Sequence, residues 1–342
     1  MRLAVILALV LAGCDATAPT TTGVPTTQPA ESLVPTADAT VAPSPSRSPD
    51  GSAKLTARDV RDAVDLADIR AHLAELQRIA DAHGGNRATG TTGFDASVEY
   101  VAEQLDAAGY EVTRQPFSVG DVSSVNLIVE RAGADPEMIM LGAHLDSVEA
   151  GPGINDNGTG VSTLLVLAQR LAELPPPRST VRIAFWGAEE GGPHGSPAYI
   201  AALSATELAR IGSYLNFDML GSPNAIRFVY AEVGAAEGSE TITSLFTDYF
   251  EGEGLSWAPI DLAGHSDHGA FTEAGIPTGG LFSGGREPMT SEQAAAFGGI
   301  AGQPSDPCSD QACDTIDNVH DATVDEMADA VAHAVATLAA GD

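Results

Sequence analysis

Histidine and carboxylate side chains follow directly on an apolar run near the middle of the chain. The run Met138–Gly142 ends at His144 and Asp146, and a glycine-rich loop then carries Asp156. Imidazole nitrogens and carboxylate oxygens are ligands that zinc and manganese accept in proteins. The stretch therefore indicates a metal site at the end of a strand. A structural histidine followed by an ordinary Asn-Asp-Asn-Gly turn is the alternative that this stretch alone leaves open.

Two further segments that we expect to be strands are also followed by acidic residues. Val181–Trp186 is followed by Glu189 and Glu190, and Tyr214–Phe217 is followed by Asp218. The carboxyl ends of strands in an open α/β sheet meet where ligands bind, so we expect all these side chains to converge. Mutual repulsion would raise their pKa values, and because the motifs contain no lysine or arginine, one or two divalent cations are the expected partners. A solvated acidic turn is the alternative for the glutamate pair.

The order of the expected elements favours an α/β fold. Apolar residues recur at helical spacing within 69–80, 98–105, 159–173, 241–250 and 324–338. Extended segments are expected at 111–117, 125–130, 138–142, 181–186, 214–217 and 276–282. Strands that alternate with helices predict a mainly parallel sheet covered on both faces. No repeat and no second boundary is visible, so residues 56–342 are predicted to form a single domain.

The composition limits the partners of the protein. The 342 residues include 47 acidic and 16 basic ones, which gives a formal net charge of −31. This charge argues against direct binding to nucleic acid or to an anionic lipid surface, and it favours cations. Cys308 and Cys313 lie close together in a chain that we expect to be exported, so a local disulfide is predicted. We expect a monomer.

The amino terminus is typical of an exported protein. Residues 1–13 contain a short basic start and an apolar stretch too short to span a bilayer. The sequence LAGC, which ends at Cys14, resembles the lipobox of bacterial lipoproteins and implies acylation of that cysteine; an ordinary signal peptide is the alternative. Residues 14–55 are rich in Thr, Pro, Ala and Ser and are predicted to form a disordered tether. We expect a lipoprotein on the outer face of the bacterial cytoplasmic membrane, or a released form of it.

Several motifs in series carry a family resemblance. In chain order they are AHLDSVEAGPGINDNGTG, FWGAEEGG, YLNFDMLGSPN, GHSDHGAF, GGLFSG and CSDQACDTIDNV. Together they resemble the secreted bacterial di-zinc leucine aminopeptidases of the streptomycete type, metallopeptidase family twenty-eight, over Asp65–Leu338. The resemblance implies a phosphorylase/hydrolase-like three-layer α/β sandwich with a central mixed, mainly parallel sheet. It also implies two zinc ions and the removal of apolar amino-terminal residues from peptides.

The resemblance implies roles for the acidic and histidine residues. His144 and Asp218 would bind the first zinc ion, Glu190 would bind the second, and Asp156 would bridge the two. Glu189 would act as the general base. A metal lowers the pKa of a water molecule that it binds, Glu189 would take the proton, and the same carboxyl group would then protonate the leaving amine.

Three more positions support this assignment. Asp146 would accept a hydrogen bond from His144 and fix its tautomer, which makes the imidazole a better ligand. Met219 and Phe282 match positions that line the pocket for the terminal side chain in the resembled family. Core packing is the alternative for both, because apolar residues are usually buried.

Two acidic groups outside the zinc ligands also match the family. Asp325 and Asp329 share one face of a helix. The resemblance suggests that they form a calcium site with the start of the domain near Asp62 or Asp65. An exposed acidic helix face is the alternative. Asp267 and His268 belong to a motif near the cleft, for which a purely structural role is the alternative.

The disulfide loop departs from the family pattern. Relatives have Tyr-His before the second cysteine; the histidine is the last ligand of the second zinc ion and the tyrosine hydroxyl stabilises the oxyanion. This chain has Ser309 and Asp310 in that loop. Asp310 can bind a cation through oxygen but would make the metal a weaker Lewis acid, and Ser309 is too short to replace a tyrosine. His320 is a conceivable replacement ligand, although its place in the family pattern is not a ligand position.

Three functions follow as hypotheses. The favoured one is an active zinc aminopeptidase that is slower, or altered in metal preference, because of Asp310. The second is a surface lipoprotein that binds peptides without cleaving them. The third is another metal-dependent amidohydrolase of similar fold, such as a carboxypeptidase or a glutaminyl cyclase. A basic residue that could hold a substrate carboxylate would favour the carboxypeptidase, and the motifs contain none.

Overall fold

The computed structural model describes residues 55–340. The predicted signal peptide (residues 1–13), the predicted acylation of Cys14 and nearly all of the predicted tether (residues 14–55) lie outside the described residues. Only Leu55, the last residue of the predicted tether, is described. Leu55 is 5% exposed and packs in the hydrophobic core, so the folded domain includes it. The other predictions about the amino terminus stay predictions.

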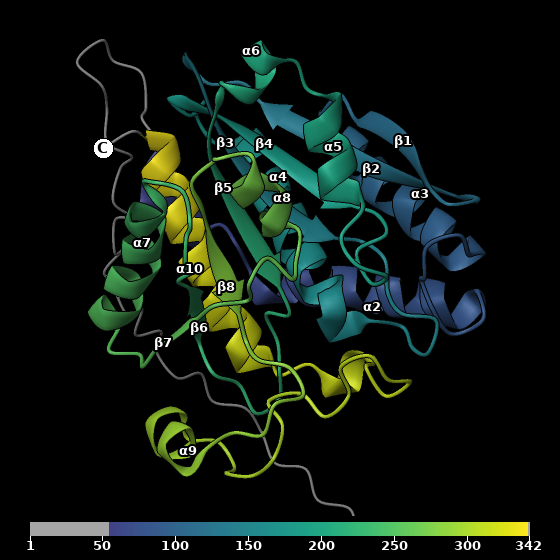
Figure 1. Ribbon diagram of the computed structural model, residues 1–342, viewed down its shortest axis with the longest axis vertical. Helices are drawn as coiled ribbons and strands as arrows, with labels where there is room; N and C mark the ends of the chain where they lie inside the picture. The colour runs from purple at the N-terminus through teal and green to yellow at the C-terminus, as the bar shows by residue number, and fades with distance from the viewer. Residues whose placement is uncertain (1–54, 341–342) are drawn as a thin grey trace, which may run out of the picture. The chain divides into compact units, whose positions relative to one another are not determined.

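Helices and strands alternate along the described chain, as Figure 1 shows. The helices are α1 (Ala57–Arg61), α2 (Leu66–Ala82), α3 (Thr92–Ala107), α4 (Thr159–Glu173), α5 (Gly195–Ala202), α6 (Ala205–Leu208), α7 (Ser239–Gly252), α8 (His268–Glu273), α9 (Ser291–Phe297) and α10 (Asp321–Ala340). The strands are β1 (Thr113–Val119), β2 (Val122–Arg131), β3 (Asp135–His144), β4 (Ser179–Trp186), β5 (Ile211–Asp218), β6 (Phe228–Tyr230), β7 (Ala258–Ile260) and β8 (Thr278–Phe282).

All eight strands form one mixed sheet in the order β1-β2-β4-β3-β5-β8-β6-β7. The central strands β4, β3, β5 and β8 run parallel to one another, and β6 pairs with β7 in the same sense. Antiparallel pairs join β1 to β2, β2 to β4, and β6 to β8. The prediction of a mixed, mainly parallel sheet flanked by helices is confirmed.

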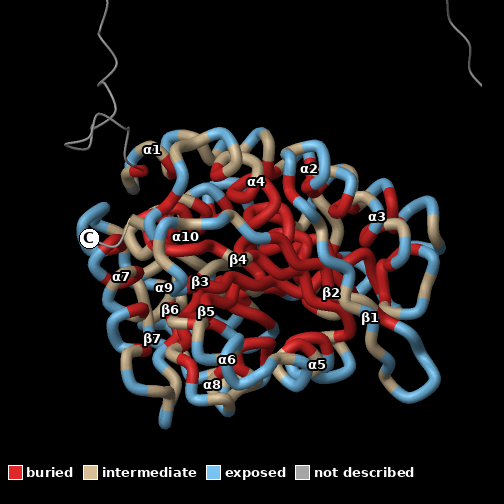
Figure 2. Tube along the Cα trace, turned by 90° about the horizontal axis from the view of Figure 1, so that it is seen from above, coloured by how far each residue is buried: buried red, intermediate tan, exposed pale blue. Residues whose placement is uncertain are grey.

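Side chains of the central strands alternate between two hydrophobic layers. Ile139 and Leu141 of β3 belong to the larger core, which α2, α3, α4 and α10 cover. Met138 and Met140 point to the opposite face, where they share a smaller core with Tyr214 beneath α5 and α8. Figure 2 shows the buried strands between these two helical layers. Burial on both faces explains why the strands read as continuous apolar runs.

The long elements occur where the sequence predicts them, and the short ones were not predicted. The helix expected at 159–173 has these bounds in the structure, and the other predicted helices and strands differ from the observed ones by a few residues at their ends. The three-residue strands β6 and β7 are too short to show a period. Among residues 55–340, no helix combines the length and apolarity that crossing a membrane requires.

Candidate metal centre

His144 and Asp218 end two neighbouring parallel strands on the same face of the sheet. Gly142 of β3 pairs with Asn216 of β5, and the two side chains lie two residues further along each strand. His144 is 1% exposed, and its Nε2 lies 3.4 Å from Asp218 Oδ1. The other carboxylate oxygen of Asp218 accepts a hydrogen bond from Ser266 Oγ at 2.8 Å. Strand register thus brings together two predicted ligands that are 74 residues apart.

The loop after β3 brings Asp156 to the same place. Asp156 Oδ1 lies 3.2 Å from His144 Nε2. The backbone of this loop is held by Asp314, whose two carboxylate oxygens accept the N–H groups of Asn155 and Asp156, both at 2.9 Å. Asn155 Nδ2 also donates to Asp306 Oδ2 at 2.6 Å. Two buried carboxylates next to the disulfide loop therefore fix the position of Asp156.

The turn after β4 carries Glu189 and Glu190, and Asp146 holds this turn. The carboxylate of Asp146 accepts the backbone N–H of Glu189 at 3.0 Å and that of Glu190 at 3.4 Å. His144 Nδ1 lies 3.2 Å from the backbone oxygen of Asp146 and 3.7 Å from its carboxylate. In this structure the nearer acceptor for the imidazole is therefore the carbonyl group, while the side chain of Asp146 positions the acidic turn.

His144, Asp156 and Glu190 offer three ligand atoms that all lie within 4.8 Å of one another. Glu190 Oε1 is buried and has no hydrogen-bond partner among residues 55–340. Leaving a buried carboxylate oxygen without a partner costs free energy, and a cation would supply the partner. One imidazole with several carboxylates is a donor set that suits zinc or manganese. Asp218 Oδ1 lies near the same imidazole nitrogen, His144 Nε2, as Asp156 Oδ1 does, so a fourth predicted ligand belongs to this group.

The negative charges of Asp156, Glu190 and Asp218 exceed the positive charge that His144 can supply. Burial, and then the charge of Asp156, raise the pKa of Glu190 to about 10. Burial also raises the pKa of Asp156 to about 6, although His144 lowers it. Burial opposes protonation of His144, but the carboxylates of Asp218, Asp146 and Asp156 outweigh it and raise the pKa of the imidazole well above its ordinary value. A single imidazole is too little positive charge for these acids, and a divalent cation would remove the excess.

Asp310 is paired with a basic residue in this structure. Its Oδ2 lies 2.5 Å from Arg286 Nη2, and the two side chains are 31% and 55% exposed. Asp310 does not belong to the group of three ligand atoms, but its charge contributes to the raised pKa of Asp156. The predicted disulfide between Cys308 and Cys313 is present and closes the loop that holds Asp310. Metal binding by Asp310 stays a prediction, and it would require the carboxylate to leave Arg286 or to be shared with it.

The residues predicted for the terminal side chain lie beside the metal ligands. Phe282 of β8 pairs in register with Asp218 of β5, and its ring stacks on Phe228 at 6.0 Å. Met219 follows Asp218 directly and is 4% exposed. Asp267 is fully buried and accepts a hydrogen bond from Ser196 Oγ at 2.6 Å. Burial raises the pKa of Asp267 to about 7, against the lowering effect of the nearby imidazole.

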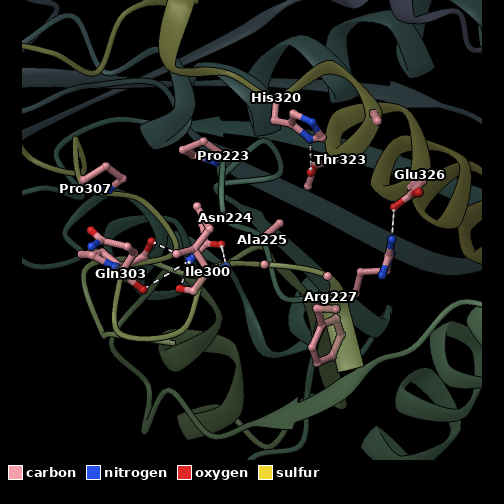
Figure 3. A pocket seen from close by; sticks show the side chains of 15 residues that line it. Pro223, Asn224, Ala225, Arg227, Ile300, Gln303, Pro307, His320, Thr323 and Glu326 are labelled. Atoms are coloured by element: carbon pink, nitrogen blue, oxygen red, sulfur yellow. Dashed lines mark hydrogen bonds and ion pairs between the residues drawn. The ribbon is translucent and has the colours of Figure 1, made fainter. Parts of the chain in front are cut away.

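His320 lies in a different part of the molecule. A cavity of about 510 Å³ lies between α10 and the segments 223–227 and 297–307, and Figure 3 shows its lining. His320 Nδ1 lies 2.8 Å from Thr323 Oγ1 there, near the ion pair of Arg227 and Glu326. Of the described residues that were predicted to bind zinc, His144, Asp156, Glu190, Asp218 and Asp310 do not line this cavity. His320 is thus not part of the group that His144 forms.

Two residues that position the centre were not predicted from the sequence. Arg87 is fully buried and donates to the carbonyl groups of Leu145, Pro152 and Gly153, which belong to the loops that carry Asp146 and Asp156. Burial lowers the pKa of its guanidinium to about 10. The second residue is Asp314, described above. Each acts through backbone groups far away in sequence, so its residue type and immediate neighbours do not reveal its partners, although Asp314 belongs to the motif CSDQACDTIDNV.

The acidic group predicted to bind calcium lies on α10. Asp329 is half-buried, and its burial, followed by the charge of Asp325, raises its pKa to about 6. Arg61 of α1 lies nearby, with its Nη1 3.3 Å from Glu253 Oε1. Asp65 caps α2 by accepting the N–H of Ala67 at 2.7 Å. Calcium binding stays a prediction, since Arg61 already supplies positive charge to this group.

Removal of bound metal is expected to lower the thermal stability of the protein. A ligand at about 100 times its dissociation constant adds about 2.7 kcal/mol to the free energy of unfolding. For a domain of this size, that corresponds to a rise in Tm of about 4–5 °C. Calorimetry of chelator-treated protein before and after addition of zinc measures this shift. Glu190→Gln should reduce the shift, whereas Glu103→Gln, an exposed position on α3, should not; equal shifts in both variants would contradict the ligand role of Glu190.

The sequence is similar to those of known peptidases. The sequence model of Peptidase family M28 matches residues 126–335. The leupeptin-inactivating enzyme 1 of Streptomyces exfoliatus is 45% identical over 285 residues, which is 81% of this chain and 63% of that protein. The probable lipoprotein aminopeptidase LpqL of Mycobacterium tuberculosis is 38% identical over 271 residues, 73% of this chain and 54% of that protein. The chain thus spans between 54% and 63% of the length of these two relatives.

The fold is also shared with solved structures. A zinc aminopeptidase from Bacillus subtilis superimposes with a TM-score of 0.68 at 17% identity, over 80% of this chain and 94% of that one. At this identity the likeness concerns the fold alone. The sequence match covers more than half of the chain and contains His144 and the three acidic residues gathered around it, Asp156, Glu190 and Asp218. The chain therefore belongs to peptidase family M28.

Proposed function

We propose that the protein is a zinc-dependent aminopeptidase that removes apolar residues from the amino termini of peptides. The observation that carries the proposal is the convergence of His144, Asp156 and Glu190, whose ligand atoms lie within 4.8 Å of one another. Glu189 precedes one of these ligands on the same turn. Family membership and the printed names of the relatives, which include aminopeptidases, support the same reaction.

His144, Asp156, Glu190 and Asp218 would hold the metal. A divalent ion in this position supplies Lewis-acid polarisation of a carbonyl group and a lowered pKa of water. Glu189 accepts a proton from the attacking water and returns one to the leaving amine. Burial, followed by the charges of Asp218 and Asp267, raises the pKa of Glu189, which His144 opposes. This shift belongs to the centre without a cation, and a bound divalent ion would lower the pKa of Glu189 toward the range in which a carboxyl group can both take and give a proton near neutral pH.

The charge of the centre favours a free amino terminus over an internal peptide bond. The carboxyl groups of Asp218, Asp267 and Glu189 lie near one another. They would attract the α-amino group of a peptide, because this group is cationic near neutral pH. Phe282 and Met219 lie on the β8 side of these acids, where they would contact an apolar terminal side chain. The preference for apolar terminal residues rests on these two side chains.

Neither of the two basic residues near the centre points to a carboxypeptidase, and Arg87 already donates to three backbone carbonyl groups. Arg286 is held by Asp310 at 2.5 Å, so its charge is already matched by a carboxylate of the protein. A carboxypeptidase needs a basic group that is available to the substrate carboxylate.

The test compares blocked and free substrates with the zinc-loaded protein. Leucinamide should be hydrolysed, whereas N-acetyl-leucinamide should not, because acetylation removes the cationic amino group. Chelator treatment should abolish the activity, and zinc should restore it. Zinc-loaded protein that leaves leucinamide intact would contradict the proposal and favour peptide binding without cleavage. Hydrolysis of the acetylated amide at an equal rate would indicate another amidohydrolase.

A further inference from the structure

A second pocket opens directly beside the metal centre. Its volume is about 370 Å³, within the range of roughly 300–1,000 Å³ that is usual for ligand sites. Asp146 and Glu190 belong both to this pocket and to the metal centre. The pocket is therefore continuous with the place where a peptide bond would be cleaved, and no step described above uses it.

The outer wall of the pocket is apolar and is formed by the hairpin of β1 and β2. Val119 and Val122 face each other across its turn, and both line the pocket. Val122 is 43% exposed, one of three large hydrophobic side chains exposed in the part of the chain that the structure describes. A Cβ atom at Gly90 would lie 2.7 Å from Val122 Cγ1, so the hairpin packs closely on the loop that contains Gly90. The hairpin is thus packed against the Gly90 loop, and the exposed surface of Val122 is available to a ligand.

The rim of the pocket is acidic. Glu149 is exposed at its edge, and Glu190 and Asp146 lie at its inner end. Among the residues that line it in the described chain, no lysine or arginine is present. An apolar wall with an acidic rim matches a long side chain that has an aliphatic stem and a cationic end.

The strand order gives the direction in which a substrate would lie. β4, β3 and β5 carry the metal centre, β2 lies next to β4, and β8 lies next to β5. Phe282 of β8, proposed to contact the terminal side chain, is on one side of the centre, and Val122 of β2 is on the other. A peptide that places its first residue near β8 and its scissile bond at the centre therefore continues toward the pocket.

We propose that this pocket binds the side chain of the second residue of the peptide and favours lysine or arginine there. The inference rests on the aminopeptidase function proposed above. The aliphatic part of the basic side chain contacts Val119 and Val122, and its cationic end pairs with Glu149. The pocket thereby selects the residue that becomes the new amino terminus after cleavage.

The experiment compares kcat/KM for leucyl-lysyl-glycine, leucyl-glutamyl-glycine and leucinamide, which has no second residue. Wild-type protein is expected to prefer the lysyl over the glutamyl peptide by about fivefold, the factor that one exposed ion pair can supply. Glu149→Lys should abolish or reverse this preference. Equal values for the two peptides in the wild-type protein, or an unchanged preference in Glu149→Lys, would overturn the inference.

A pair of variants on one strand tests the apolar wall. Val122→Trp should fill the pocket and lower kcat/KM for leucyl-lysyl-glycine, relative to leucinamide, by about tenfold. Ser123→Trp is the matched control, because Ser123 is exposed on the opposite face of the same strand and does not line the pocket. An equal ratio in both variants would contradict the inference.

Binding measurements test the inferred role of the pocket without requiring that the protein cleave peptides. Calorimetry with leucyl-lysyl-glycine and leucyl-glutamyl-glycine analogues, in which a methylene group replaces the first peptide carbonyl, gives Kd without cleavage. Tighter binding of the lysyl analogue, lost in Glu149→Lys, supports the pocket even in a protein that leaves leucinamide intact. Equal affinities overturn the pocket even if leucinamide is hydrolysed.

Discussion

Replacing Glu189 with glutamine is expected to lower kcat for leucinamide by about 10²–10⁴, the range that general acid–base groups contribute. The amide cannot accept a proton from water or return one to the leaving amine, but it keeps the size of the side chain. The zinc content should stay close to that of the wild-type protein, because His144, Asp156 and Glu190 remain. Steady-state kinetics and metal analysis of the same preparation measure both quantities.

Glu190→Gln is the matched comparison, since it makes the same chemical change at the next position. This variant should lose zinc affinity as well as activity, because Glu190 offers a ligand atom and Glu189 does not belong to that group. If Glu189→Gln keeps its activity, or loses zinc to the same extent as Glu190→Gln, the division of roles between the two glutamates is wrong.

The double change Ser309→Tyr and Asp310→His is expected to raise kcat by about 10²–10³, the effect of one oxyanion donor. Ser309 is 6% exposed and too short to reach a developing oxyanion, and Asp310 is held by Arg286 at 2.5 Å. Asp310 has a φ of 55°, a backbone conformation that histidine adopts more readily than most residues. A histidine at position 310 would place a neutral imidazole where the negatively charged carboxylate now pairs with Arg286. Kinetics with leucinamide and a zinc titration measure the gain.

Asp310→Asn serves as the control for this pair of changes. It removes the charge that pairs with Arg286 but restores neither the tyrosine hydroxyl nor the imidazole. Its kcat should therefore stay well below that of the double variant. If the double variant shows neither higher turnover nor higher affinity for a second zinc ion, the disulfide loop does not limit activity.

The sequence alone predicts the strand ends of the centre because burial and chemistry change at the same residue there. The strands that end near His144, Glu189 and Asp218 are mostly buried along their length, and acidic residues or histidine follow where they reach the edge of the sheet. Parallel pairing then forces these ends to meet, so the convergence follows from the α/β pattern. The disulfide was predictable for a similar reason, since Cys308 and Cys313 are near neighbours in sequence.

The supporting contacts could not be predicted, because their partners lie far away in sequence and are often backbone groups. Arg87 holds carbonyl groups 58 to 66 residues away, and Asp314 holds N–H groups 158 and 159 residues away. The pairing of Asp310 with Arg286 depends on the course of two loops outside the helices and strands. The nearer contact of His144 with the carbonyl group of Asp146 likewise depends on a turn whose conformation no residue pattern specifies.

The central claim is that a divalent metal ion joins these residues, and crystallography at the zinc absorption edge tests it most directly. Crystals grown with zinc should show an anomalous peak within about 2.0–2.2 Å of His144 Nε2 and of an Asp156 oxygen, the usual zinc–ligand distances. A second peak next to Glu190 would show that two ions bind despite Asp310. Crystals of zinc-treated protein with no anomalous peak among His144, Asp156 and Glu190 would contradict the account.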